Sequence, residues 1–201
     1  MYLVALAADQ RPLCLVAKPI PVLALAAWVL AAAPTPFGRL VAAGLLSSAV
    51  GDLFLETGLF LPGLVAFLCA HLAYLAAFLQ VERRPALARA LPFAAWGALA
   101  LVVLWPGLGG TTVPVTAYVA VICTMMWRAA ARVGSASASG AVAWLGLAGA
   151  VAFGASDTLI AFDRFHAPLP GVAWPVMALY WLGQLGIAAS AVRACGMLRE
   201  R

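Results

Sequence analysis

Long apolar runs, separated by short stretches rich in proline, glycine and charge, dominate the pattern along the chain. A helix needs about 20 mostly apolar residues to cross the hydrocarbon core of a bilayer, and seven runs reach or approach that length. They are 19–33, 39–56, 60–79, 88–106, 113–131, 139–162 and 174–195. The first run is short, but its flanks can extend it. The pattern therefore predicts an all-α, polytopic transmembrane helical bundle with seven full spans.

The segments between the runs contain turn formers, as in 34–36, 106–110 and 168–171. They are too short to fold by themselves, so we expect residues 1–201 to form a single transmembrane domain. Residues 1–8 are apolar, yet as a helix they would extend only about 12 Å. They lack the basic region and small-residue cleavage site of a signal peptide. We interpret them as the tail of a shortened first span.

The composition supports a membrane protein, because 66% of the residues are hydrophobic and 9% are charged. Soluble domains average about half apolar and about a quarter charged residues. The net charge of +5 does not indicate a nucleic-acid partner, because the basic residues lie between apolar runs rather than on one basic face. The four cysteines are scattered without disulfide or metal-ligand spacing, and we interpret them as small apolar fillers.

Basic residues are distributed unevenly between the two ends of the predicted spans. Only Arg11, Lys18 and Arg164 fall at one end. The other end carries Arg39, Arg83, Arg84, Arg89, Arg128, Arg132, Arg193, Arg199 and Arg201. Basic loops stay on the cytoplasmic side, so the arginine-rich end and the C-terminus are predicted to be cytoplasmic. Abundant Ala, Leu and Arg with a single Lys suggest a GC-rich bacterial genome, and hence a bacterial inner membrane.

A weak internal similarity links two segments that leave the membrane in the same direction. Gly51–Leu55 resembles Ser156–Ile160, and each aspartate is followed eight residues later by a phenylalanine, Phe60 or Phe165. A duplicated four-helix unit, a 4+4 pseudo-repeat, would explain this similarity and would call for eight helices. Chance similarity among apolar sequences is an equally good explanation.

Several spans contain ionisable residues, which cost about 2.5–3.5 kcal/mol each to insert and therefore need a reason. Asp52 and Glu56 lie one helical turn apart near the outer end of the 39–56 run. Asp157, next to Ser156, lies in the outer third of the 139–162 run. Lys18 precedes the proline at the outer start of the 19–33 run.

Other polar residues lie at similar depths. His71 and Tyr74 share a helix face about 16 Å into their span, and Tyr180 and Gln184 share a face about 9 and 15 Å from the outer end of theirs. All these groups fall between the outer interface and the midplane. We therefore predict one polar cavity that opens outward, with Asp52 as one of its two most costly members and the aspartate of the 139–162 run as the other.

Each of these residues also has a purely structural interpretation. In this interpretation, Asp52 and Glu56 are polar groups at a helix end. His71 or Gln184 would serve as a hydrogen-bonded link between two helices. Tyr180 would serve as part of the interfacial aromatic belt.

The same segments resemble the YhhN-like lysoplasmalogenase family. The first half of the family pattern is matched by Lys18-Pro19, Ser48–Leu55 and Gly63–Tyr74. The second half is matched by Gly149–Ala161 and Val176–Gln184. One Gly-Asp or Ser-Asp pair means nothing alone, but the ordered set, from about residue 11 to residue 190, is specific.

The resemblance implies eight transmembrane helices and hydrolysis of the vinyl ether of lysoplasmalogens. The products would be a fatty aldehyde and glycerophosphoethanolamine or glycerophosphocholine. The expected partners are this lysophospholipid substrate and the lipid bilayer, with no protein partner. The chain departs from the family pattern at its N-terminus, where the first helix is mostly absent.

Vinyl ethers hydrolyse by acid catalysis, which calls for one protonated carboxyl group and one carboxylate, as in glycosidases. Asp52 and Asp157 are the candidate catalytic pair, and we do not assign which is the acid. The candidate substrate-binding residues are Lys18 for the phosphate, together with Glu56, His71, Tyr74, Ser156, Tyr180 and Gln184. No cofactor is expected.

No metal is expected either, since the chain has only two histidines and His166 lies in a loop. A metal site of Asp52, His71 and Asp157 is the alternative, and activity that survives strong chelation would argue against it. A small-solute or lipid transporter or channel would also have intramembrane acids. Its polar groups would line the whole crossing path, whereas here they stop near the midplane, which favours an enzyme.

Overall fold

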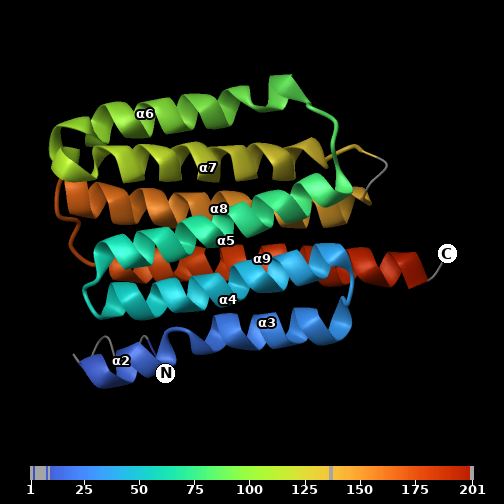
Figure 1. The fold of residues 1–201 in the computed structure, drawn as a ribbon, viewed down its shortest axis with the longest axis horizontal. Coiled ribbons are helices and arrows are strands. Elements are labelled where there is room, and N and C mark those ends of the chain that lie inside the picture. The colour runs from blue at the N-terminus through green and yellow to red at the C-terminus, as the bar shows by residue number, and fades with distance from the viewer. Residues whose placement is uncertain (1, 3–7, 9, 136–137, 200–201) are drawn as a thin grey trace.

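A computed structural model describes residues 2, 8, 10–135 and 138–199, and within them the chain is helical without β-strands. The predicted stub at residues 1–8 lies, apart from Tyr2 and Ala8, outside the described residues. The helices, drawn in Figure 1, are α2 (Arg11–Ala17), α3 (Ile20–Ala32), α4 (Pro36–Glu56), α5 (Phe60–Val81), α6 (Leu91–Leu108), α7 (Thr112–Ala131), α8 (Gly140–Phe165) and α9 (Ala173–Arg199). Two 3₁₀ turns, η1 (Leu87–Arg89) and η2 (Gly109–Thr111), flank α6.

Six helical segments in the described part of the chain are long and apolar enough to cross a membrane. One of them, Leu87–Ala131, has 45 residues and would be about 68 Å long if straight, more than twice the hydrocarbon thickness. The chain folds this segment back on itself at Gly109, whose φ of 49° is accessible to glycine. Helices α6 and α7 therefore lie side by side (Figure 1).

The first span begins before residue 19, where the apolar run suggested that it starts. Helices α2 and α3 together form an apolar segment, Pro12–Ala32. Lys18 and Pro19 at their junction both have right-handed helical backbone angles, so the helical direction is largely kept. Proline has no backbone N–H to donate, which is why the hydrogen-bonded helix is interrupted there.

Helix ends elsewhere differ from the predicted bounds by a few residues. Helix α4 begins at Pro36 rather than 39, because Thr35 caps it by accepting a hydrogen bond from the amide of Gly38 at 3.1 Å. Helices α8 and α9 extend beyond the predicted residues 162 and 195. These extensions are more polar than the spans, so hydropathy alone placed the ends too early.

Glycines allow the closest helix contact, between α8 and α9. A Cβ at Gly149 would lie 2.7 Å from the backbone of Gly183 and Ile187, and one at Gly186 would lie 2.8 Å from Gly149. Backbone contact of this kind is typical of membrane helices, which gain stability from close packing rather than from excluding water. The α4–α5 pair is also packed extensively.

The helix that precedes each of the pairs α4–α5 and α8–α9 also packs on the second helix of the other pair. Helix α3 packs on α4 and α9, while α7 packs on α8 and α5. Helices α4 and α8 run in the same direction (Figure 1). Phe60 and Phe165, the two phenylalanines eight residues after each aspartate, contact each other with ring centroids 5.6 Å apart. This arrangement is what a duplicated helical unit would produce.

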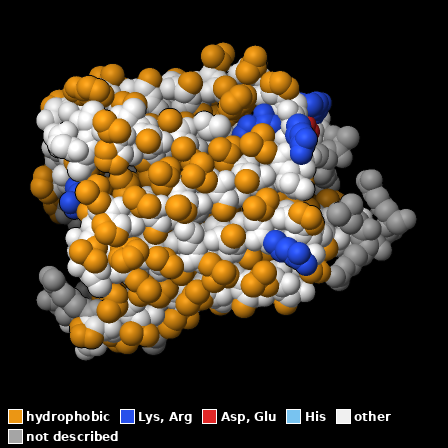
Figure 2. All heavy atoms as spheres, viewed as in Figure 1, with side chains coloured by type: hydrophobic (Ala, Val, Ile, Leu, Met, Phe, Trp, Pro, Cys, Tyr) orange, Lys and Arg blue, Asp and Glu red, His pale blue; other side chains and the backbone are white. Residues whose placement is uncertain are grey.

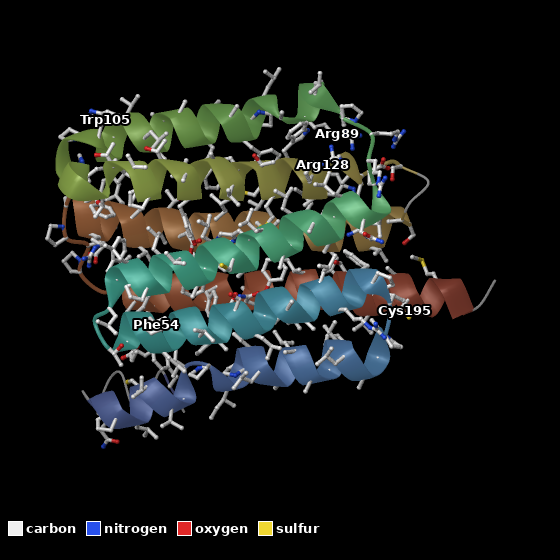
Figure 3. All side chains as sticks on the ribbon, viewed as in Figure 1. Phe54, Arg89, Trp105, Arg128 and Cys195 are labelled. Atoms are coloured by element: carbon white, nitrogen blue, oxygen red, sulfur yellow. The ribbon has the colours of Figure 1, made fainter. Side chains whose placement is uncertain are left out.

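The surface is apolar along the helices and basic at one end. Many leucines, valines and tryptophans along the helices are exposed, Val102 and Val113 by 73% and 78%, as lipid-facing residues are. Figure 2 shows blue side chains mostly near one end, and Figure 3 places Arg89 and Arg128 there, opposite Trp105.

Two arginines hold the α5–α6 loop against the C-terminal end of α7 through hydrogen bonds. Arg128 donates hydrogen bonds to the carbonyl groups of Glu82, Arg84 and Pro85. Arg89 donates to two carbonyls at the α7 end, including that of Ala130 at 2.6 Å. Burial alone would raise the pKa of Glu82, but hydrogen bonds from Ser135 and Arg84 lower it from 4.5 to about 2. The arginine-rich end is thus a built structure rather than a set of free charges.

Candidate functional site

Asp157 lies at the centre of a three-residue cluster contributed by α5, α7 and α8. The hydroxyl of Tyr118 donates to Asp157 Oδ2 at 2.5 Å. His71 Nε2 lies 3.0 Å from the same oxygen and 2.8 Å from the Tyr118 hydroxyl. A proton on Nε2 can be shared between Asp157 Oδ2 and the Tyr118 hydroxyl, whereas the buried Nδ1 of His71 has no hydrogen-bond partner among the described residues. Among the described residues no hydrogen bond reaches Asp157 Oδ1, so this oxygen is available to a ligand.

The second aspartate has a separate set of partners. Tyr180 on α9 donates its hydroxyl to Asp52 Oδ2 at 2.7 Å, and the two side chains are almost fully buried. Tyr180 is therefore not part of an interfacial belt. Lys18, Glu56 and Asp157 all lie close enough to Asp52 to act on it electrostatically. Lys18 Nζ is 3.3 Å from Glu56 Oε2, so the lysine charge already has a carboxylate partner.

Tyr74 and Gln184 form a third polar contact, between α5 and α9. The Tyr74 hydroxyl donates to Gln184 Oε1 at 2.6 Å, and both side chains are fully buried. The Tyr74 ring packs directly on Gly44, where a Cβ would come within 2.3 Å of it. Tyr74 and Gln184, which the sequence placed on polar helix faces, therefore form a hydrogen bond with each other.

An aromatic core stands between these polar groups. The Phe153 ring lies at the middle, with centroid distances of 4.6 Å to His71, 5.4 Å to Tyr180 and 6.4 Å to Tyr74. Phe67 adds edge contacts of 6.1 Å to Phe153 and 5.9 Å to Tyr180. The predicted polar residues therefore surround shared phenylalanine rings.

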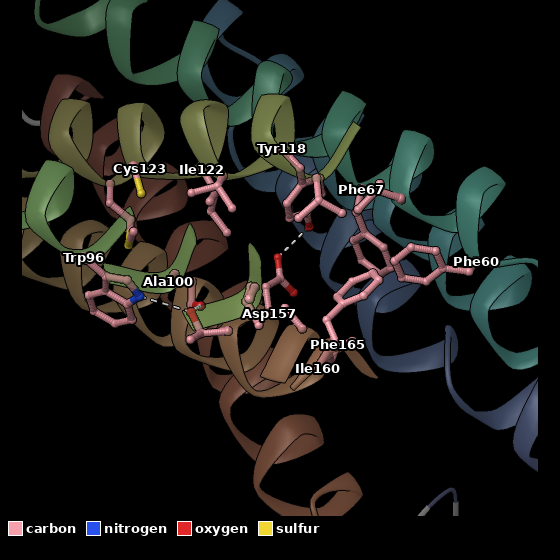
Figure 4. A pocket seen from close by; sticks show the side chains of 18 of the residues that line it. Phe60, Phe67, Trp96, Ala100, Tyr118, Ile122, Cys123, Asp157, Ile160 and Phe165 are labelled. Atoms are coloured by element: carbon pink, nitrogen blue, oxygen red, sulfur yellow. Dashed lines mark hydrogen bonds between the residues drawn. The ribbon is translucent and has the colours of Figure 1, made fainter. Parts of the chain in front are cut away.

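A cavity opens beside Asp157 and is lined almost entirely by apolar side chains of α4 to α8. Figure 4 shows Tyr118 and Asp157 hydrogen-bonded to each other in its wall, with Phe60 and Phe165 towards one end and Trp96 towards the other. The volume open to the centres of water molecules is about 70 Å³, so the cavity can hold several waters.

Asp52 is not among the residues that line this cavity. The prediction of one pocket containing both carboxyl groups is therefore wrong for this cavity, which holds Asp157 alone. The reason is the packing of Phe67, which lines the cavity and lies on Gly51 next to Asp52. The ring therefore lies both in the cavity wall and next to the residue that precedes Asp52.

One predicted site residue faces elsewhere, and one contributor was missed. Ser156 is buried and donates to the Val176 carbonyl at 3.0 Å, so it links α8 to α9. This hydrogen bond corrects its assignment as a substrate-positioning group. Tyr118 was not singled out, although a hydroxyl about 8 Å into the 113–131 run was a signal of the same kind as Tyr180.

Two residues at the far end of the cavity also went unnoticed in the sequence. Trp96 Nε1 donates to Thr158 Oγ1 at 3.1 Å, and both side chains line the cavity. This contact holds the indole of α6 against α8. Within the described part of the chain, no group of three or more His, Cys, Asp or Glu side chains is arranged to hold a metal ion.

The fold and site together define a class: a polytopic helical membrane protein with a tyrosine- and histidine-bonded carboxyl group at an internal apolar cavity. The sequence profile of the YhhN family matches residues 13–191, and the chain belongs to this family. No solved structure matches the chain significantly.

Named relatives cover most of the chain. It is 36% identical to human lysoplasmalogenase TMEM86B over 181 residues, 88% of this chain and 74% of that protein. It is 38% identical to human lysoplasmalogenase TMEM86A over 167 residues, 79% of this chain and 68% of that protein. A lysoplasmalogenase of Mycobacterium bovis is 36% identical over 178 residues, 79% of this chain and 64% of that protein.

Proposed function

We propose that this protein is a lysoplasmalogenase, which hydrolyses the vinyl ether of lysoplasmalogens to a fatty aldehyde and a glycerophospho-alcohol. The observation that carries the proposal is a single carboxyl group, Asp157, exposed to an otherwise apolar cavity within the membrane-spanning bundle. An alkenyl chain needs such apolar walls, and its ether needs an acid or carboxylate beside it. The names of the relatives point to the same reaction.

The reaction begins when a proton is delivered to the β-carbon of the vinyl ether. The resulting oxocarbenium ion takes up water, and the hemiacetal collapses to aldehyde and alcohol. Asp157 is proposed to act directly at the ether through its free Oδ1, while Tyr118 and His71 fix its other oxygen. A carboxyl held in this way acts at one defined position, which lowers the entropic cost of the reaction.

Asp52 is proposed as the second catalytic carboxyl group. It lies within electrostatic range of Asp157, and Tyr180 orients it. Its contact with substrate requires the Phe67 ring to move from its place on Gly51. We do not assign which aspartate delivers the proton.

The other predicted polar residues are proposed to hold this arrangement together. Tyr74 and Gln184 join α5 to α9 beneath the two aspartates, and His71 connects α5 to Asp157. Glu56 holds Lys18 at the outer rim near Asp52. These contacts keep the carboxyl groups oriented while substrate enters.

The topology is proposed to comprise seven spans, with α6 and α7 crossing separately and α2–α3 crossing once. The arginine-rich end would be cytoplasmic, which puts the C-terminus inside and the cavity in the outer half of a bacterial inner membrane. Periplasmic labelling of a cysteine introduced in the 166–172 loop, with none at the arginine-rich end, would agree with this orientation. The reverse pattern would contradict it.

Purified protein in nanodiscs tests the function directly. Fatty aldehyde should form from a defined lysoplasmalogen, and Asp157→Asn should abolish it. Asp163→Asn on the same helix is the matched control, because Asp163 lies outside the cavity lining and its Oδ1 accepts from the Leu169 amide, as an asparagine oxygen also can. Absence of aldehyde with the wild-type protein, or solute flux in its place, would refute the proposal.

A further inference from the structure

A cationic side chain lies at the outer end of the Asp157 cavity. The Arg164 guanidinium lies 3.9 Å from the ring centroid of Phe60 and 5.8 Å from that of Phe165. Both rings line the cavity. Arg164 therefore lies on the two aromatic side chains that form this end of the cavity wall.

The charge of Arg164 is free for a ligand. Its side chain is exposed, and no hydrogen bond or ion pair joins it to another described residue. Lys18, the residue that the sequence suggested for a phosphate, is instead paired with Glu56 and only 13% exposed. Of these two cations at the outer end, Arg164 is the one without a carboxylate partner.

The spacing along α8 places Arg164 in register with Asp157. Seven residues are nearly two helical turns, so both side chains lie on one face, about 10 Å apart along the axis. In a lysoplasmalogen, three glycerol carbons separate the ether oxygen from the phosphate ester, a short span of the same order.

We propose that Arg164 binds the phosphate of the lysophospholipid while the vinyl ether lies at Asp157. This inference rests on the proposed function and adds to it a headgroup site. The planar guanidinium can donate two parallel hydrogen bonds to phosphate oxygens, which an ammonium group cannot. Its contact with Phe60 orients it before the ligand arrives, because a cation is attracted to the ring face.

Binding of two uncleavable ligands tests the site without requiring turnover. The first ligand is a saturated 1-alkyl lysophospholipid, and the second is the 1-alkylglycerol of the same chain length, which has no phosphate. Arg164→Gln should weaken binding of the first about tenfold and leave the second unchanged. Arg164→Lys should recover part of the lost affinity, because lysine keeps the positive charge but cannot donate two parallel hydrogen bonds.

The matched control is Arg39→Gln, which removes an exposed arginine charge from the other end of the bundle. It should change neither ligand. Equal losses for both ligands in Arg164→Gln would mean that Arg164 only supports the Phe60 and Phe165 wall, which overturns the inference. It is also overturned by unchanged affinities, or by a phosphate-dependent loss in Lys18→Gln alone.

Aldehyde release separates this inference from the proposed function. An active wild-type enzyme whose Arg164→Gln variant has an unchanged KM for lysoplasmalogen would keep the function and remove the phosphate site. An inactive wild-type protein that still loses phosphate-dependent binding in Arg164→Gln would keep the site and remove the function.

Discussion

The surroundings of Asp52 and Asp157 differ although their helices occupy corresponding places. Each aspartate is bonded by a residue of the other helix pair: Asp52 by Tyr180 of α9, and Asp157 by His71 of α5. Within the described part of the chain, Asp157 lines a cavity to which α6 contributes apolar side chains beside α8, and Asp52 is not among its lining residues. Around Asp52, Phe67 on Gly51 closes the corresponding space.

This comparison teaches that one sequence motif can serve two roles within a bundle. The Gly-Asp and Ser-Asp pairs place a carboxyl group at similar depths in two parallel helices. The neighbouring helix then decides whether that carboxyl group meets a ligand or stays enclosed.

The largest expected effect comes from removing the exposed carboxyl group. Asp157→Asn should lower kcat at least a thousandfold, within the range that positioned acid–base groups contribute. It should still bind the saturated alkyl lysophospholipid. Single-turnover aldehyde release and ligand binding measure the two quantities. If Asp52→Asn abolishes release while Asp157→Asn does not, the comparison is reversed.

The next largest effect should distinguish Tyr118, which binds Asp157, from Tyr180, which binds Asp52. Tyr118→Phe removes a donor from Asp157 without changing the cavity shape, and kcat should fall roughly ten- to a hundredfold because a hydrogen bond that orients the proposed catalytic carboxyl group is lost. Tyr180→Phe removes the donor of the enclosed Asp52 and should change kcat less. Steady-state kinetics on both variants decide the order. Equal losses would mean that both aspartates act at the substrate in the same way.

A matched pair of glycines sharpens the comparison at the level of packing. Gly44 and Gly149 each lie eight residues before an aspartate. Gly149→Ala places its Cβ against the α9 backbone, which cannot move independently, and should destabilise the protein by about 1–3 kcal/mol or more. The Cβ of Gly44→Ala would meet the side-chain ring of Tyr74 rather than backbone, and this substitution should cost less. Thermal unfolding in detergent measures both variants. A larger loss for Gly44→Ala would contradict this reasoning.

The smallest effect concerns the opposite end of the bundle and is needed to interpret any pH profile. The folded-state pKa of Glu82 is lowered from 4.5 to about 2, so its stabilising contribution is complete above pH 4.5 and is lost as pH falls towards 2. Glu82→Gln should flatten the dependence of unfolding on pH in that window. Unfolding followed between pH 7 and 3 tests this, and an unchanged slope would contradict it.

Much of the architecture is determined locally and could be predicted from the sequence. Hydropathy and the 1.5 Å rise per residue place the helices and their buried polar groups, because both depend only on nearby residues. The arginine-rich end follows from the same segmentation. Asp52, Asp157 and His71 were predicted to lie inside the bundle on this basis, and the structure places them there.

Only the tertiary structure decided how each helix is rotated and which helices are neighbours. That rotation turned Ser156 towards the Val176 carbonyl and paired Lys18 with Glu56. It also brought Tyr118 to Asp157 and packed Phe67 against Phe153. These outcomes depend on the volumes and close contacts of side chains far apart in the chain, such as Gly51 against Phe67. The 3.6-residue period of a single helix carries no information about such contacts.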